Sequence, residues 1–195
     1  MFTGIIENTG SIKEIINSGS NKTFWVESPI ANELKVDQSL SHNGVCLTVE
    51  EIKNDLHRVT AIEETLLKTN LGNWQNGTVI NLERCMQLNG RFDGHIVQGH
   101  VDAIAACIWV ESKGGSWEYS FVFEKKFAPL IIEKGSVTVN GISLTCYNVT
   151  TDNFSIAVIP YTFEHTNMKT VKNGDLVNIE FDMVGKYINR IKSLK

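Results

Sequence analysis

Hydrophobic and polar residues alternate over short runs along most of the chain, and this pattern predicts β-strands. Gly, Asn and Asp separate the runs. Six short antiparallel strands in about 90 residues predict a closed or nearly closed Greek-key barrel, because closure removes exposed strand edges. The fold class predicted is therefore all-β, and the expected strands are 10–16, 23–27, 39–40, 46–52, 57–62 and 78–82 in the first half, and 103–110, 119–123, 136–139, 143–149, 154–158 and 176–181 in the second.

Three segments depart from this alternation. Residues 64–71 and 161–169 lack it, and we expect them to form short helices or turns that cap the barrels. In the tail, apolar residues follow one another at spacings of 4, 3 and 3, which predicts a short amphipathic helix over 184–195. About three turns of helix are marginally stable alone, so the helix is expected to pack on its own barrel or to join subunits.

A repeat divides the chain into two similar halves. Residues 43–48 read Asn-Gly-Val-Cys-Leu-Thr and residues 140–145 read Asn-Gly-Ile-Ser-Leu-Thr, at an offset of 140 − 43 = 97. The same offset places 64–83 on 161–180 with seven identities, and Asn-Gly between strands is a strong hairpin pattern. The starts of the halves align more loosely, with 5–7 on 96–98 at an offset of 91. We predict a tandem duplication, with domains 1–89 and 90–183, a hinge near 87–91 and the separate short helix at 184–195.

Charge and composition narrow the partners. The chain has 195 residues, 42% of them hydrophobic, and a net charge of −4 without a block of like charges, so neither nucleic acid nor an anionic membrane is an expected partner. The longest apolar run, 103–110, is far shorter than the roughly 20 residues that span a bilayer. The N-terminal residues lack a secretory pattern and the four cysteines form no CxxC pair, so we expect a cytoplasmic protein with free thiols and no metal.

The repeated hexapeptide offers candidate binding groups in each half. The period of two in a strand places Cys46 with Thr48, and Ser143 with Thr145, on a common face with the leucine opposite. Such polar pairs beside a hairpin turn can bind the edge of a polar heterocycle, although a single copy would also fit an ordinary alternating strand. Two copies at a fixed offset predict two similar sites, one in each half.

Two histidines lie in the sequence Gly-His-Ile-Val-Gln-Gly-His at 94–100. On an unbroken strand His95 and His100 would face opposite sides, but a bulge at Gly99 would bring both to one face. The alternative is that one or both are partly exposed strand residues without a chemical role. The other three histidines, His42, His57 and His165, have no comparable setting and are expected to be structural.

Several of these motifs together resemble the riboflavin synthase family of the alpha type. They are Met-Phe-Thr-Gly-Ile-Ile-Glu at 1–7, His-Asn-Gly-Val-Cys-Leu-Thr-Val at 42–49, the segments 64–66 and 69–72, Gly-His to Gly-His-Val-Asp at 94–102, and Val-Asn-Gly-Ile-Ser-Leu-Thr at 139–145. The resemblance runs from residue 1 to about 183. It implies two six-stranded barrels and a homotrimer assembled by C-terminal helices, with active sites between the N-terminal barrel of one subunit and the C-terminal barrel of its neighbour.

The resemblance also implies a reaction. Two molecules of 6,7-dimethyl-8-ribityllumazine would become riboflavin and 5-amino-6-ribitylamino-2,4(1H,3H)-pyrimidinedione by transfer of a four-carbon unit, without metal or organic cofactor. Lumazine synthase is a candidate partner. The alternative within the same fold is a non-catalytic lumazine- or flavin-binding antenna protein. Retention of both hexapeptide copies and of Gly99-His100 favours the enzyme.

The resemblance carries over to individual positions. It implies an N-barrel pocket lined by Gly4, Ile5, Ile6, Cys46, Leu47, Thr48, Thr60, Ala61, Ile62, Glu63, Glu64 and Thr65. It implies a C-barrel pocket lined by Gly99, His100, Val101, Lys134, Ser143, Leu144, Thr145, Ala157, Val158, Ile159, Pro160, Tyr161 and Thr162. Ser39, His95 and Asp182 match further functional positions. We expect His100 to transfer a proton, and Ser39 and Cys46 to assist addition to the acceptor lumazine.

Overall fold

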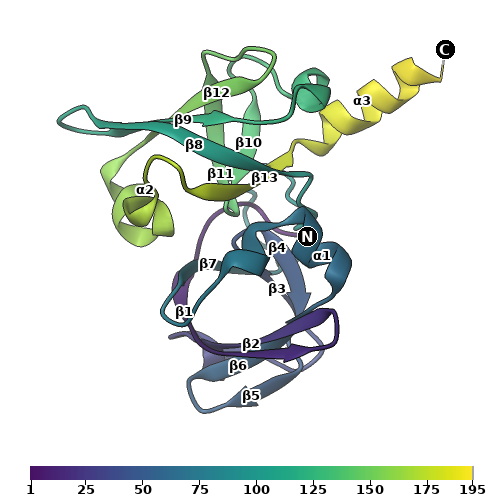
Figure 1. Ribbon diagram of the computed structural model, residues 1–195, viewed down its shortest axis with the longest axis vertical. Coiled ribbons are helices and arrows are strands. Elements are labelled where there is room, and N and C mark those ends of the chain that lie inside the picture. Colours follow the sequence, from purple (N-terminus) through teal and green to yellow (C-terminus); the bar gives the residue numbers. More distant parts are fainter. Residues whose placement is uncertain (195) are drawn as a thin grey trace.

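The computed structural model describes residues 1–194 and contains two β-sheets stacked end to end, with one helix projecting from the upper half (Figure 1). The N-terminal sheet contains β1 (Asn8–Ser18), β2 (Asn21–Glu27), β3 (Ser39–His42), β4 (Val45–Thr48), β5 (Glu51–Lys53), β6 (Leu56–Ala61) and β7 (Val79–Arg84). The C-terminal sheet contains β8 (Ala103–Ser112), β9 (Trp117–Val122), β10 (Ser136–Val139), β11 (Ile142–Tyr147), β12 (Asn153–Val158) and β13 (Leu176–Phe181). The strands of the N-terminal sheet lie within residues 8–84, and those of the C-terminal sheet within residues 103–181.

Short helices occupy the segments that lack alternation. The structure has α1 (Glu63–Lys68) followed by the 3-10 turn η2 (Asn70–Asn73), and α2 (Pro160–His165) followed by η4 (Asn167–Thr170). Two further 3-10 turns are η1 (Ala31–Glu33) and η3 (Lys125–Leu130), and α3 (Met183–Ser193) ends the chain. The predicted capping segments and the predicted tail helix are confirmed, except that Lys195 lies outside the described residues.

The two sheets share one topology. The C-terminal sheet is a closed barrel in the order β10-β11-β12-β9-β8-β13, and the N-terminal sheet has the matching order β4-β3-β7-β1-β2-β6-β5. The predicted strand 46–52 is divided, because β4 pairs with β3 whereas β5 pairs with β6. Glu50 N donates to Arg58 O at 2.9 Å where the segment bends between these partners. One bent segment therefore takes the place of β11, and the prediction of six-stranded barrels is confirmed.

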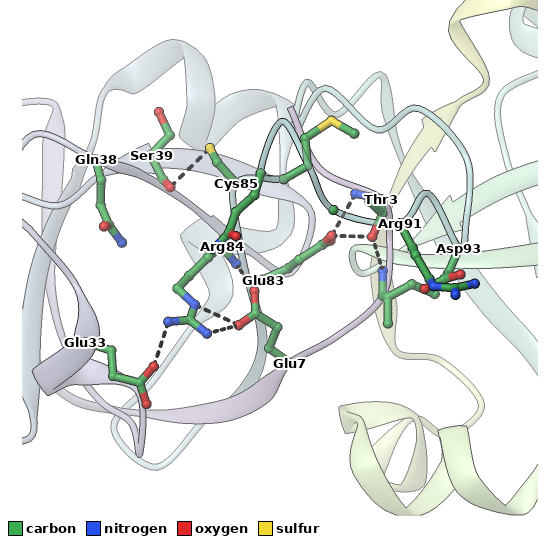
Figure 2. Close-up of a pocket in the computed structure, with 14 residues that line it drawn as sticks. Thr3, Glu7, Glu33, Gln38, Ser39, Glu83, Arg84, Cys85, Arg91 and Asp93 are labelled. Atoms are coloured by element: carbon green, nitrogen blue, oxygen red, sulfur yellow. Dashed lines mark hydrogen bonds and ion pairs between the residues drawn. The ribbon is translucent and has the colours of Figure 1, made fainter.

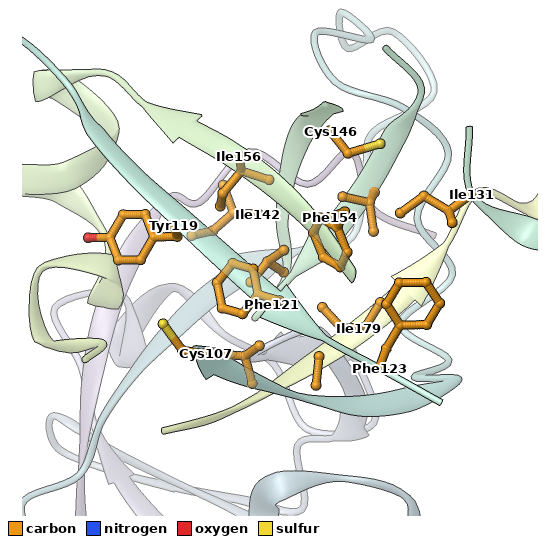
Figure 3. Close-up of a cluster of buried hydrophobic side chains, with 14 of the residues drawn as sticks. Cys107, Tyr119, Phe121, Phe123, Ile131, Ile142, Cys146, Phe154, Ile156 and Ile179 are labelled. Carbon is orange, nitrogen blue, oxygen red and sulfur yellow. The ribbon is translucent and has the colours of Figure 1, made fainter. Parts of the chain in front are cut away.

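Each barrel encloses its own core, as the alternation predicts. Aromatic rings fill the C-terminal barrel: Phe154 packs against Phe121 and Phe123 with ring centroids 5.5 and 5.9 Å apart (Figure 3). The N-terminal core is built mainly from aliphatic side chains around Phe24 and Trp74. Full burial of side chains of this size stabilises each barrel by roughly 1.5–3 kcal/mol per side chain.

The two Asn-Gly hairpin turns pack back to back between the barrels. Asn43 and Gly44 have φ of 48° and 81°, and Asn140 and Gly141 have φ of 46° and 83°, the left-handed conformations that a two-residue hairpin turn requires. A Cβ atom on Gly44 would lie 2.8 Å from the backbone nitrogen of Gly141, and the reverse distance is 2.7 Å. Glycine is required at both positions because no side chain fits between the turns.

Buried asparagines join the halves in a reciprocal pattern. Asn81 Nδ2 donates to Asn140 O at 2.9 Å, and Asn178 Nδ2 donates to Asn43 O at 2.9 Å. The backbone nitrogens of Asn81 and Asn178 donate to the side-chain oxygens of Asn43 and Asn140, within their own halves. The repeat identities at offset 97 therefore form an interface in which each half presents the same groups to the other.

The segments that lead into each barrel cross to the other half. Phe2 and Val97 exchange backbone hydrogen bonds of 2.7 and 3.1 Å, so the two segments run antiparallel. Gly4 O accepts from Ser143 N at 2.8 Å, and Gly99 O accepts from Cys46 N at 2.9 Å. Gly4 is thus the counterpart of Gly99, at an offset of 99 − 4 = 95. The offset of 91 expected for the starts of the halves is wrong, because the backbone contacts set the alignment there.

Helix α3 begins at its N-cap Asp182 and extends away from both sheets (Figure 1). Its apolar stripe is exposed: Val184 is 58%, Ile188 51% and Ile191 57% accessible. Its first turn lies near η3, where a Cβ on Gly185 would be 3.2 Å from Leu130 O. The barrel of the same chain therefore covers only the base of this helix. Over residues 1–194, the structure contains no helix long and apolar enough to cross a membrane.

Candidate functional site

The polar faces of β4 and β11 are the first part of the site. Leu47 is buried while Cys46 is half-buried and Thr48 exposed, so the leucine points into the barrel and the other two side chains point out. In β11, Ser143 is half-buried and Thr145 exposed, while Leu144 packs against the core. The predicted shared faces are confirmed in both halves.

Each polar face is covered by the crossing segment of the other half. Gly99 has φ of 79°, and a Cβ there would lie 2.6 Å from the Cβ of Cys46. Gly4 has φ of 78°, and its Cβ would lie 2.6 Å from the Cβ of Ser143. These glycines are required both by the left-handed conformation and by the close approach.

The predicted division of the pocket residues must therefore be corrected. Gly4, Ile5 and Ile6 were expected with Cys46–Thr48, but they lie with Ser143, and Ile6 packs against the C-terminal core. Gly99, His100 and Val101 were expected with Ser143, but they lie with Cys46, and Val101 packs against the N-terminal core. The crossing of the chain exchanges the two segments, which repeat spacing alone does not reveal.

The ends of β6 and β12 carry exposed apolar side chains. Ile62 and Ile159 are equivalent positions immediately before α1 and α2, and they are 56% and 59% exposed. Ala61 and Val158 point inward and are buried, whereas Tyr161 is 70% exposed. Exposed aliphatic and aromatic side chains of this kind suit the flat face of a heterocycle. The remaining positions of these two segments are Thr60, Glu63, Glu64 and Thr65, and Ala157, Pro160 and Thr162.

Two predicted groups have other local partners. The Thr60 hydroxyl bonds to Thr23 at 2.9 Å and to Glu50 at 3.0 Å. Lys134 is exposed in the turn before β10, has φ of 60°, and places its ammonium 5.3 Å from the Tyr147 ring centroid. Within its own chain, Lys134 contacts the Tyr147 ring with its ammonium and donates its backbone N–H to the Cys146 carbonyl.

His95 belongs to the C-terminal half. Its Nδ1 lies 2.7 Å from the Ser143 hydroxyl and its Nε2 lies 3.2 Å from the Thr138 hydroxyl, and the ring is 7% exposed. Burial lowers the pKa of His95, and the charge of Asp182 opposes this shift. A neutral ring held between two hydroxyls orients the serine and can exchange a proton with it.

His100 has a different environment. It is exposed, and it follows the glycine whose carbonyl accepts from Cys46. The expectation that a bulge at Gly99 brings both histidines to one face is wrong: residues 94–102 form no strand, and only Val97 makes a bridge, to Phe2. The left-handed Gly99 instead carries the chain from Ser143 in one half to Cys46 in the other.

Ser39 lines an open cavity of about 530 Å³ at the mouth of the N-terminal barrel (Figure 2). It pairs with Thr48 across the β3–β4 ladder, and its carbonyl accepts a weak bond from the Cys85 thiol at 3.4 Å. Arg84 crosses the same cavity, 2.6 Å from Glu7 and 2.7 Å from Glu33. Thr3 and Ile5 also line the cavity, so it adjoins the crossing segment.

Two buried glutamates, which were not among the predicted site residues, hold the crossing segments. Glu83 accepts from Thr3 N at 2.7 Å (Figure 2) and from Gly4 N at 3.0 Å. Glu180 accepts from the backbone nitrogens of residues 98–100. Burial raises the pKa of both carboxyls, and the backbone donors oppose that shift. The identity of Glu83 and Glu180 at the offset of 97, each beside core positions of its strand, could have identified them.

Within residues 1–194, no group of three or more His, Cys, Asp or Glu side chains is arranged to hold a metal ion. The four cysteines are free thiols, two of them buried, one half-buried and one exposed. The candidate groups are therefore hydroxyls and backbone amides in both halves, at the boundary between the barrels. The Cys46 thiol lies beside the segment of His100, and the Ser143 hydroxyl is bonded to the imidazole of His95.

Comparison with known proteins agrees with this duplicated architecture. The lumazine binding domain family matches residues 3–85 and again 98–182. Riboflavin synthases from Bacillus subtilis (strain 168) and Actinobacillus pleuropneumoniae are each 38% identical over 97% of this chain and 89% of their own, and the Saccharomyces cerevisiae riboflavin synthase is 36% identical over 97% and 85%. A crystal structure of LumP complexed with riboflavin superposes with a TM-score of 0.87, at 21% identity, over 93% of this chain and 99% of that chain.

Two barrels, two crossing segments and two matches to one domain family define a tandem lumazine-binding-domain protein. The identity with riboflavin synthases over nearly the whole chain narrows the assignment further. The chain belongs to the riboflavin synthase family of transferases.

Proposed function

We propose that this chain catalyses the dismutation of two molecules of 6,7-dimethyl-8-ribityllumazine to riboflavin and 5-amino-6-ribitylamino-2,4(1H,3H)-pyrimidinedione. The observation that carries the proposal is the pair of equivalent sites, Cys46 with Gly99 and Ser143 with Gly4, in contacts that repeat from one half to the other. A reaction between two identical molecules requires two similar sites. LumP, which shares the fold, has been crystallised with this lumazine and with riboflavin.

The roles of the residues follow from what the reaction needs. One lumazine must lose a proton from its 7-methyl group, and the carbanion that results is delocalised over the ring. The other must accept addition at C7. The four-carbon unit that leaves one molecule is gained by the other, so no external oxidant is consumed. Holding two flat rings face to face can contribute up to roughly 7–11 kcal/mol to the acceleration.

The two sites differ in the groups that can move protons. The segment beside Cys46 carries His100, which is exposed and can act as the proton-transferring group. Cys46 and Ser39, which pairs with Thr48 on the neighbouring strand, would assist addition to the acceptor. In the other half Ser143 is bonded to His95, and Asp182 lies close enough to influence the charge of that ring. The hydroxyls of Thr48 and Thr145 and the backbone of Ile5 and Ile6 would hold the ring edges.

The proposal extends to assembly and location. A homotrimer joined through α3 would bury the stripe of Val184, Ile188 and Ile191, which this chain leaves exposed. It would also bring a neighbour's site against the exposed apolar side chains of Ile62 and Ile159. Four free thiols suit the reducing cytoplasm. Lumazine synthase, which would supply the substrate, is the partner we expect.

The test is turnover. The purified protein is incubated anaerobically with 6,7-dimethyl-8-ribityllumazine, and riboflavin is followed by absorbance. We expect one riboflavin and one pyrimidinedione for every two lumazines consumed, and a His100→Gln variant should lower kcat at least about tenfold. If kcat for that variant stays within about threefold of wild type between about pH 5 and 9, the role of His100 is wrong.

The second candidate is a non-catalytic lumazine- or flavin-binding antenna protein, which the likeness to LumP in fold favours. It predicts tight stoichiometric binding of the lumazine without riboflavin formation. The presence of the polar hexapeptide face in both barrels favours the enzyme, because an antenna needs only one ligand site.

A further inference from the structure

We propose that Glu180 is a positioning residue for this reaction: its buried carboxylate fixes the backbone of residues 98–100 and thereby sets where His100 stands against the Cys46 strand. The inference rests on the proposed role of His100 in the reaction. It assigns to Glu180 no contact with the substrate.

The geometry at Glu180 is a clamp made by both carboxylate oxygens. Oε1 accepts from Gln98 N at 2.7 Å, and Oε2 accepts from Gly99 N and His100 N at 2.9 Å each. The residue is 2% exposed, so water does not compete for these bonds. Three converging N–H groups match an anion with two acceptor atoms, and bonds to a charged acceptor are about twice as strong as neutral ones.

The clamp connects the histidine to the site in the other half. Gly99 donates its N–H to Glu180 and offers its carbonyl to Cys46 N at 2.9 Å, so one residue is held from both barrels. His100 is the next residue, and its own N–H is bound to the same carboxylate oxygen. A shift of Glu180 would therefore move His100 relative to Cys46.

The segment is also held beyond the histidine. Asp102 accepts from Phe181 N at 2.9 Å and forms an ion pair of 2.6 Å with Lys186 of α3. The side chains of this pair are 19% and 24% exposed. The backbone that carries His100 is thus fixed at His100 by Glu180 of β13, and two residues later through the bonds of Asp102 to Phe181 of β13 and Lys186 of α3. These contacts leave its main chain little freedom.

Glu83 provides a matched control inside the same chain. It forms a similar clamp, with bonds of 2.7 Å from Thr3 N, 2.7 Å from the Thr3 hydroxyl and 3.0 Å from Gly4 N, and it is 3% exposed, although Ile5 N bonds to the Thr3 hydroxyl and not to the carboxylate. The residue at the position of His100 is Ile5, by the offset 100 − 5 = 95, and Ile5 cannot transfer a proton. Loss of either clamp should cost similar stability, but only the loss of Glu180 displaces a titratable side chain.

The first measurement is amide hydrogen exchange on wild type, Glu180→Gln and Glu83→Gln. Glutamine keeps one acceptor and turns an NH₂ group toward backbone donors, so we expect the amides of Gly99 and His100 to exchange at least about tenfold faster in Glu180→Gln. In Glu83→Gln the effect should fall on Thr3 and Gly4 instead. If exchange at Gly99 and His100 is unchanged in Glu180→Gln, the proposal is overturned, and this holds whether or not the protein turns over lumazine.

The second measurement is a double-mutant cycle on kcat with 6,7-dimethyl-8-ribityllumazine. We expect Glu180→Gln to lower kcat about 10–100-fold in wild type but less than about threefold when His100→Gln is already present. Glu83→Gln should lower kcat by the same factor in both backgrounds. Equal costs of Glu180→Gln in both backgrounds would show a merely structural role and overturn the proposal.

A conservative variant covers the case in which Glu180→Gln does not fold. Glu180→Asp keeps the charge but shortens the side chain by one methylene, so we expect exchange at Gly99 and His100 and the kcat loss to fall between those of wild type and Glu180→Gln. If Glu180→Asp folds with wild-type exchange but loses kcat as fully as His100→Gln, the carboxylate acts otherwise than by positioning, and the proposal is wrong.

Discussion

A buried pair of histidines should make the N-terminal barrel sensitive to acid. His42 Nδ1 donates to Leu40 O at 3.0 Å, and its Nε2 lies 2.9 Å from His57 Nε2, with both residues fully buried. Burial lowers the pKa of both rings and keeps them neutral, so His42, whose proton is on Nδ1, accepts at Nε2 from His57 Nε2. Within residues 1–194 no carboxylate hydrogen-bonds to either ring, so an added proton would place an uncompensated charge in the core.

The size of the effect follows from the pKa values. Burial lowers the pKa of His57 from 6.5 to about 4, and the pKa of His42 is lowered well below 6.5 by burial and by His57. Between about pH 6.5 and 4 the unfolded chain binds more protons than the folded one, so the free energy of unfolding falls as the pH falls. For His57 alone the loss by about pH 5 is about 2 kcal/mol, or roughly 4–8 °C in Tm.

The second barrel supplies the control. At the offset of 97, His42 and His57 correspond to Val139 and Phe154, both fully buried in the C-terminal core. The double variant His42→Val with His57→Phe therefore places in one barrel the side chains that the other already uses. It removes both titrating groups while keeping each position apolar and filled.

The assay is thermal unfolding of wild type and the double variant near pH 7.5 and 5, at one protein concentration because assembly also affects Tm. Burial raises the pKa of Glu83 and Glu180, which changes stability in the opposite direction, but those groups are the same in both proteins. We expect the Tm of wild type to fall by at least about 4 °C more than that of the variant. Parallel falls in the two proteins would refute the reasoning.

Three further predictions concern the interface, the site and the tail. Asn81→Asp replaces two buried N–H donors by an anion that faces acceptors. The free energy of unfolding, measured by calorimetry, should therefore fall by at least about 3 kcal/mol. Gly99→Ala should lower kcat more than about tenfold because its Cβ would meet Cys46. The control Gly114→Ala, with φ of 76° and open space around it, should leave kcat unchanged and lower the free energy of unfolding by about 1 kcal/mol. Ile188→Asp on the exposed stripe of α3 should reduce the mass measured by sedimentation to that of one chain.

Much of the fold could be predicted from the sequence because the patterns that specify it, strand alternation and the internal repeat, are local or occur twice. Alternation located every strand, and the offset of 97 between the Asn-Gly-x-[Cys/Ser]-Leu-Thr copies located the duplication. The bend at Val49 and Glu50 could not be found, since it depends on which strands lie on either side of the segment.

The site was predicted less completely because it is assembled by long-range contacts. The pairing of Gly4 with Ser143 and of Gly99 with Cys46 depends on how the two barrels stack, and no local pattern encodes that arrangement. The same stacking separates His95 from His100. The carboxylates of Glu83 and Glu180 were visible only as repeat identities, and their partners are backbone groups, which any sequence provides.

The central claim is that each half completes the site of the other, so that one chain carries two equivalent ligand sites. It is tested most directly by titrating wild type, Gly4→Ala and Gly99→Ala with riboflavin and following the quenching of its fluorescence. We expect two sites per chain in wild type, with Gly4→Ala removing the site at Ser143 and Gly99→Ala removing the site at Cys46. A single site per chain in wild type, or loss of the same site in both variants, would contradict the account.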